Sequence, residues 1–184
     1  MLEHEEGLRA DARANRDRIL EAAREAFAAS LDASLNSIAK AAGVGAGTLY
    51  RHFPSREALL AGVYRKEIDA LAALAPALLH KHPPGEALHR WCERFALAGN
   101  VKQGLTGALR AAVSDQEIQD AYQTLVGAVR RLTEACAKAG EASPDASPED
   151  VLVLLSSVLR IPPTPEGKAQ AARIIDLVLR ALRA

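Results

Sequence analysis

The chain has 184 residues, of which 49% are hydrophobic and 4% aromatic, a composition that favours a helical core of Ala and Leu over a sandwich of strands. Its formal net charge is zero, no apolar run is long enough to span a membrane, and the charged N-terminus lacks the apolar segment of a secretory signal. We therefore expect a cytoplasmic protein without a membrane partner, in which Cys92 and Cys136 stay reduced.

Residues 14–29 predict the first helix, which is amphipathic with Ile19, Ala23 and Phe27 on its apolar side. Arg16 lies on the opposite side and is interpreted as part of a solvated face. Residues 1–13 are expected to form an N-terminal arm.

Two very short helices joined by a glycine turn are predicted next. Ser34 is a residue type that caps helix N-termini, and Gly43 supplies the backbone freedom that ends a helix. The following helix, about Gly45 to His52, is too short to be stable alone, so Leu49 must hold it by packing. This arrangement is a helix-turn-helix.

The outer face of the second short helix suits a polyanion. With Leu49 inward, Gly47 and Arg51 point outward and Thr48 and Tyr50 flank them. Ser55 then caps a third helix whose first turn carries Arg56, an arrangement typical of a phosphate site.

Charge is distributed unevenly along the chain. Residues 9–66 carry ten Lys and Arg against six Asp and Glu, a net charge of +4, whereas residues 67–184 carry thirteen against fourteen. The positive charge therefore accompanies the helix-turn-helix, as attraction to nucleic-acid phosphate requires.

The rest of the chain also follows helical patterns. The expected helices are Ser55 to Lys81 with a kink at Pro76, Glu86 to Ala98, Val101 to Val113 after a break at Gly99 and Asn100, Gln116 to Lys138, one that opens at Ser147 and Pro148, and Lys168 to Arg183. The helix after Ser147 is apolar almost all round, so it must be covered on both sides. We expect the last two helices to pair with those of a second copy in a four-helix bundle.

Three segments, residues 19–27, 37–53 and 56–65, resemble the TetR family of transcriptional regulators. The resemblance covers about the first third of the chain and runs without gaps from Leu35 to Arg65. It implies an all-α fold in which a three-helix DNA-binding domain, residues 14–58, is joined by a long helix to a ligand-binding and dimerisation domain, residues 59–184.

The resemblance also implies roles for individual residues. Base contacts fall on Asn36, Gly45, Ala46, Gly47, Thr48 and Arg51, and phosphate contacts fall on Tyr50, His52 and Arg56. Lys40 is a further backbone candidate by position and charge, and the stretch from Arg9 to Arg16 has a second interpretation as a contact to the DNA backbone or minor groove. Because Gly45 and Ala46 replace the larger polar residues of many relatives, specificity is expected to shift toward Arg51, which we predict to read guanine.

The resemblance implies that an effector binds in an internal cavity of the C-terminal domain. The effector is expected here to be a largely apolar small molecule. The residues that we expect to line the cavity are Leu88, Trp91, Phe95, Leu109, Tyr122 and Leu125. Ordinary core packing is the alternative interpretation of the same residues.

The sequence thus predicts a homodimeric, ligand-responsive repressor that binds a palindromic double-stranded operator. The alternative is an all-α small-molecule-binding or protein-interaction module whose helix-turn-helix is vestigial. We expect no enzymatic activity, no cofactor and no metal site, because no catalytic constellation or ligand spacing can be assembled from the residues.

Overall fold

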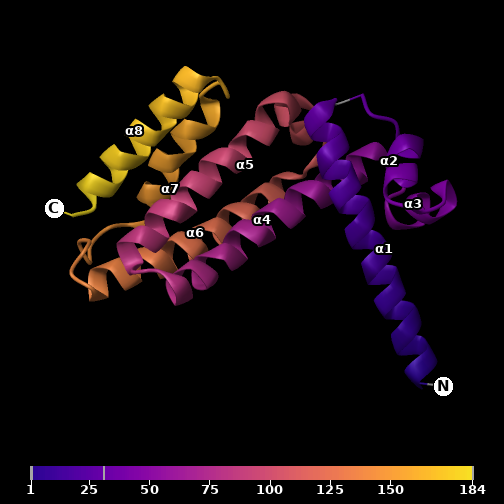
Figure 1. The fold of residues 1–184 in the computed structure, drawn as a ribbon, viewed down its shortest axis with the longest axis horizontal. Coiled ribbons are helices and arrows are strands. Elements are labelled where there is room, and N and C mark those ends of the chain that lie inside the picture. The colour runs from indigo at the N-terminus through magenta and orange to yellow at the C-terminus, as the bar shows by residue number, and fades with distance from the viewer. Residues whose placement is uncertain (1, 31, 184) are drawn as a thin grey trace. The chain divides into compact units, whose positions relative to one another are not determined.

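The computed structural model describes the backbone of residues 2–30 and 32–183, and the side chains of residues 10–30, 32–98 and 112–183. All regular structure within these ranges is helical, which confirms the predicted all-α class (Figure 1). The helices are α1 (Leu2–Ala29), α2 (Leu35–Ala41), α3 (Ala46–His52), α4 (Arg56–Lys81), α5 (Pro84–Ala112), α6 (Asp115–Lys138), α7 (Pro148–Ser156), the 3₁₀ helix η1 (Ser157–Arg160) and α8 (Pro165–Ala181). The chain divides into two compact units, Met1–Lys66 with Gly104–Val113, and Glu67–Gln103 with Ser114–Ala184.

Several helix boundaries differ from the prediction. α1 begins at Leu2, so the helix extends through most of the predicted N-terminal arm. The predicted break at Gly99 and Asn100 is wrong, because α5 runs through both residues. A glycine inside a helix costs only about 1 kcal/mol relative to alanine, which is too little to end a long helix by itself. The proline at position 76 also lies within a continuous helix, α4.

The first unit is organised around the buried side of α1. Ile19, Ala23 and Phe27 are all buried, as the period of the sequence predicted, and α1 packs against both α2 and α3. Lys66 on α4 donates to the Asp17 backbone carbonyl at 3.3 Å and pairs with the Asp17 carboxylate at 3.7 Å. The first part of α4 is thereby tied to α1.

The second unit has an aromatic centre. Trp91 on α5 is completely buried, and its indole N–H donates to the Leu71 carbonyl on α4 at 2.8 Å. Its ring stacks on Phe95, one turn away, with 5.4 Å between the ring centroids. One hydrogen bond therefore satisfies the polar atom of the largest buried side chain.

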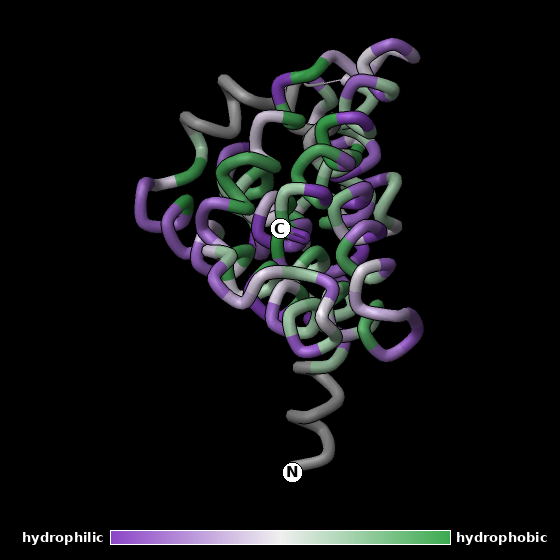
Figure 2. The backbone as a smooth tube through the Cα atoms, turned by 90° about the vertical axis from the view of Figure 1, so that its left-hand side faces the viewer, coloured by the Kyte–Doolittle hydropathy of each residue, from purple (hydrophilic) through white to green (hydrophobic). Residues whose placement is uncertain are grey.

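α6, α7 and α8 complete the second unit. α6 opens with a capping box between Ser114 and Glu117 and buries one face along its length. Figure 2 shows hydrophilic and hydrophobic segments alternating along the helices, the pattern of helices with one apolar face. α7 contacts both α6 and α8. Pro148 stands at the predicted first position of α7, and α8 begins at Pro165, three residues before the predicted Lys168.

Candidate nucleic-acid interface

Local hydrogen bonds fix the turn between α2 and α3. The Ser34 hydroxyl accepts from the backbone N–H of Ser37 at 3.1 Å and so caps α2. Gly43 follows α2 with φ of +66°, in the left-handed region that residues with a side chain rarely adopt. The predicted cap and the predicted turn glycine are both confirmed, and together they set the direction in which α3 begins.

Packing holds α3 in place. Leu49 has no exposed surface, and Phe53, which follows the last residue of α3, is also buried. A Cβ added at Gly62 of α4 would lie 2.7 Å from Phe53 Cε1, so the Phe53 ring rests directly on the α4 backbone. Because α3 has only seven residues, these contacts stabilise it more than its own hydrogen bonds do.

The opposite face of α3 is open to solvent. Gly47, Tyr50 and Arg51 are exposed, and Thr48 and His52 are half-buried. Tyr50 keeps 47% of its surface exposed, a large aromatic contribution to an otherwise polar face. Arg51 Nη2 donates to Thr48 Oγ1 at 3.0 Å, so two of the six predicted base-contact residues already form a pair.

The glycines of this face have no packing role. A Cβ added at Gly45 or at Gly47 would meet no atom within 4 Å. Gly45 caps α3 from an ordinary extended conformation, with φ of −69°, so it has no need of a left-handed backbone either. Gly47 lies inside α3, where glycine is about 1 kcal/mol less favourable than alanine. Side-chain packing therefore gives no reason for glycine at either position, and Ala46 between them is also exposed.

α2 contributes two more of the predicted residues. Asn36 lies in its first turn and Lys40 in its last turn, and both are exposed. Lys40 precedes the turn and Arg51 follows it, so exposed cations of α2 and α3 lie on both sides of the turn.

Arg56 has structural contacts that the sequence did not indicate. Its Nη1 donates to the Ala33 carbonyl at 2.7 Å, and its guanidinium lies over the Phe27 ring, 5.0 Å from the centroid. The side chain is half-buried. Ser55 caps α4 as predicted, by accepting from the Ala58 N–H at 3.1 Å. Arg56 thus joins the loop before α2 to the start of α4, and its phosphate contact stays a prediction.

Arg16 also differs from its interpretation as a solvated residue. Its guanidinium lies over the Phe53 ring, 4.5 Å from the centroid, and the side chain is half-buried. The contact joins α1 to the residue that directly follows α3. It connects segments 37 positions apart, and no helical period marks such a contact in the sequence.

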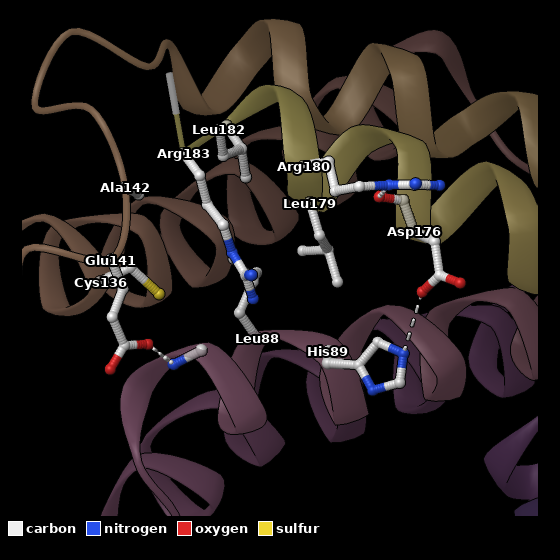
Figure 3. A pocket seen from close by; sticks show the side chains of 11 residues that line it. Leu88, His89, Cys136, Glu141, Ala142, Asp176, Leu179, Arg180, Leu182 and Arg183 are labelled. Carbon is white, nitrogen blue, oxygen red and sulfur yellow. Dashed lines mark hydrogen bonds and ion pairs between the residues drawn. The ribbon is translucent and has the colours of Figure 1, made fainter.

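The predicted effector-binding residues lie in different surroundings. Leu88, Trp91, Phe95 and Leu125 are buried and Tyr122 is half-buried, whereas the side chain of Leu109 lies outside the described residues. Of this set, Leu88 borders a pocket of about 380 Å³ among α5, the end of α6 and α8 (Figure 3). Trp91 and Phe95 stack on each other and do not line that pocket.

The cysteines are unreactive groups of the core. Both are free and buried. Burial raises the pKa of the Cys92 thiol to about 12 and that of Cys136 to about 11, so both are neutral near pH 7. Over the residues that the structure describes, no group of three His, Cys, Asp or Glu is placed to hold a metal ion. In the same ranges, no helix is both long and apolar enough to cross a membrane.

Apolar side chains remain exposed on the last two helices. On α7, Val151, Leu152 and Leu155 are buried, whereas Val153 is 60% and Leu154 54% exposed. On α8, Leu177 is 60% exposed. The residues that the structure describes therefore do not supply the predicted second covering of the α7 surface.

Comparisons with known proteins agree across both parts of the chain. Residues 19–63 match the family described as bacterial regulatory proteins, tetR family. Residues 83–184, more than half of the chain, match the C-terminal domain of SbtR-like transcriptional regulators, also a TetR C-terminal domain.

Individual relatives give the same result. A TetR transcriptional regulator from Streptomyces coelicolor has a crystal structure with a TM-score of 0.80 and 43% identity, over 91% of this chain and 98% of that one. A TetR regulatory protein from Mycobacterium vanbaalenii has a TM-score of 0.77 and 32% identity, over 96% and 99%. An HTH-type transcriptional regulator of Staphylococcus aureus is 42% identical over 64 residues, which are 34% of this chain and only 35%, about a third, of that relative.

Proposed function

The chain belongs to the TetR family of transcriptional regulators, and from this membership we propose that it is a homodimeric repressor that binds a palindromic operator and is released by a small-molecule effector. Regulators of this family bind DNA and are not enzymes, which confirms the prediction that the chain has no catalytic role. Repression, the palindrome, the homodimer and the effector are the finer parts of the proposal.

The observation that carries the proposal is the open face of α3. Two glycines without a packing role, Gly45 and Gly47, flank Ala46, and next to them lie Tyr50 and the Thr48–Arg51 pair. Small residues let a helix approach a base edge or a phosphate closely, and polar side chains beside them supply hydrogen bonds. The face therefore combines close approach with specific donors.

Each predicted contact then has a physical role. Arg51 carries a planar fork of donors that fits guanine O6 and N7 in the major groove, and Thr48 restricts its position before DNA arrives. Asn36 has the amide that pairs with adenine N6 and N7. Gly45, Ala46 and Gly47 offer close backbone approach and at most a methyl contact to thymine. Tyr50, His52 and Lys40 are assigned to phosphate, where contacts fix the register of the protein on the duplex.

The exposed apolar residues of α7 and α8 support a homodimer. Val153, Leu154 and Leu177 would be covered if α7 and α8 packed against the same helices of a second copy. Such a dimer places two copies of α3 in successive major grooves when they are about 34 to 36 Å apart. Each half of a palindrome would then meet one α3.

An effector acts through a difference in affinity between two states of the dimer. It must bind the form with the wrong α3 spacing more tightly than the DNA-binding form, with a coupling free energy of about 1 to 3 kcal/mol. Of the predicted set, Leu88 lines the pocket among α5, the end of α6 and α8. Such a coupling would release the protein from its operator in the cytoplasm.

Selection of operators from random duplexes with the full chain tests DNA binding and symmetry together. The expected result is an enriched sequence with twofold symmetry and a half-site spacing of about one helical turn. With roughly five neutralised phosphates, the logarithm of the association constant should fall against that of the salt concentration with a slope of about −4.5. A flat response, or no enriched duplex, would instead favour a vestigial helix-turn-helix.

The homodimer is tested with a matched pair of substitutions. Leu177→Asp places a charge on the exposed face of α8 and is expected to give a monomer in light scattering and to weaken operator binding. Ile118→Asp changes another exposed apolar residue, on α6, and is expected to leave the dimer intact. If Leu177→Asp stays dimeric, the α7 and α8 surface is not the interface.

A further inference from the structure

The pocket beside Leu88 is lined by leucines and by charged side chains. It holds about 380 Å³ among the first turns of α5, the end of α6 and the last turns of α8. Leu88, Leu179 and Leu182 supply apolar surface, and His89, Arg180 and Arg183 supply polar groups. The volume lies at the lower end of the range for small-molecule pockets, about 300 to 1,000 Å³.

The two acidic residues of the lining have partners within the protein. The Glu141 carboxylate accepts from the Gly85 backbone N–H at 2.7 Å, at the N-terminus of α5. A Cβ at Gly85 would clash with Glu141 Oε2, so the missing side chain makes this contact possible. Asp176 Oδ1 lies 3.8 Å from His89 Nε2.

Two arginines also line the pocket. Arg180 Nε donates to the Asp176 backbone carbonyl at 3.2 Å, whereas Arg183 is exposed and its side chain has no hydrogen-bond partner among the described residues. Arg183 follows the end of α8, and its side chain extends toward Leu88, into the hollow where Leu179 also points (Figure 3). No ion pair joins its guanidinium to another residue in the described part of the chain. A guanidinium beside three leucines is matched by a molecule with an anionic end and a short apolar body.

We propose that this pocket binds a small organic carboxylate, with Arg183 as the anchor of the carboxylate and the three leucines in contact with its hydrocarbon part. The inference rests on the proposed function where it identifies this ligand as the effector. It narrows the chemical class of the predicted effector, because a largely apolar molecule needs one anionic group to fit the site. The ligand would contact α5, the end of α6 and α8 at once, and α8 is a proposed dimer helix.

The test uses calorimetry on the full chain with three probes. Hexanoate is expected to bind, whereas hexanamide, which has the same shape without the charge, and inorganic phosphate, which has charge without an apolar body, are expected to bind at least about ten-fold more weakly. Equal binding of hexanamide would overturn the role of the carboxylate. Equal binding of phosphate would overturn the role of the leucines, and no binding of hexanoate would overturn the proposal.

Removing a positive charge and removing a negative charge from the pocket lining should change hexanoate affinity in opposite directions. Arg183→Gln is expected to weaken hexanoate binding about ten-fold or more, because a charge-assisted hydrogen bond is lost. Glu141→Gln retains an oxygen for the Gly85 N–H and removes a nearby negative charge, so it is expected to tighten binding several-fold. Arg173→Gln, on α8 outside the pocket, is the control and should leave affinity unchanged. Binding that is insensitive to Arg183→Gln would overturn the assignment.

Operator binding, measured with and without hexanoate, separates this inference from the proposed function. Hexanoate that binds through Arg183 but leaves operator affinity unchanged supports the site and contradicts its role as the effector site. If hexanoate does not bind but the protein still binds its operator, the carboxylate site is contradicted and the proposed repressor function is not.

Discussion

Gly47→Ala is the change that tests the open face of α3 most directly, because the stability of the protein and its affinity for DNA should move in opposite directions. Nothing lies within 4 Å of a Cβ added at Gly47, so the methyl group meets no clash within the protein. Alanine is favoured over glycine in a helix interior by about 0.8 to 1 kcal/mol. The substitution should therefore raise the free energy of unfolding by up to about that amount, measured by urea denaturation.

DNA affinity should fall in the same variant. If α3 lies with Gly47 against the duplex, the methyl group occupies space that the closest DNA atoms need, in both copies of a dimer. A loss of about ten-fold, or 1.4 kcal/mol, is the expected minimum. Fluorescence anisotropy with a labelled operator, at one fixed salt concentration, measures it.

Gly127→Ala provides the matched control. Gly127 is an exposed helical glycine on α6 whose added Cβ also meets nothing within 4 Å. It should stabilise the fold by a similar amount and leave operator affinity unchanged. Operator binding by Gly47→Ala as tight as that of the unaltered protein would refute the inference that this glycine serves close approach.

Three further changes address other contacts. Arg51→Ala should cost about 1 to 3 kcal/mol at one guanine of each half-site, seen by competition with operators altered at each position, and unaltered selectivity would contradict the guanine assignment. Arg56→Gln should lower the free energy of unfolding by about 1 to 2 kcal/mol, because its internal contacts are lost, and should make the salt slope shallower by about 1 for each lost phosphate contact; an unchanged slope would contradict the phosphate role. Burial raises the pKa of Cys92 to about 12, so its stabilising effect is complete below the ordinary thiol pKa and is lost as pH rises toward 12. Between about pH 8 and pH 11, the free energy of unfolding measured by urea denaturation should therefore fall less for Cys92→Ala than for the unaltered protein. An equal fall in the two proteins would contradict this.

The helix-turn-helix could be predicted because its signals are local. Ser34, Gly43 and Ser55 act through bonds or dihedral angles within three residues of themselves, and the structure confirms each of them. Leu49 could be placed inward because neighbouring positions around a seven-residue helix leave few alternatives. Capping and helical period can be read from one short window of sequence.

Contacts between distant segments could not be predicted in the same way. Arg16 on Phe53 and Arg56 on Ala33 join residues whose spacing follows no helical period. The pocket around Arg183 needs the N-terminus of α5 beside the end of α8, and Glu141 reaches Gly85 across 56 positions of sequence. A glycine with open space around it also looks, in the sequence alone, like any other small residue.

Arg56 shows how a stabilising residue resembles a DNA-binding one in the sequence. A cation in the first turn of a helix is typical of a phosphate site, yet here Nη1 is bonded to Ala33 and the guanidinium plane lies on Phe27. A guanidinium has five N–H donors, so the bond to Ala33 leaves others for an outside acceptor. The two roles are therefore compatible, but they affect different measurements. When Arg56→Gln is studied without DNA, only the loss of the internal contacts lowers the free energy of unfolding. Unfolding in the absence of DNA and the salt slope in its presence separate the two roles.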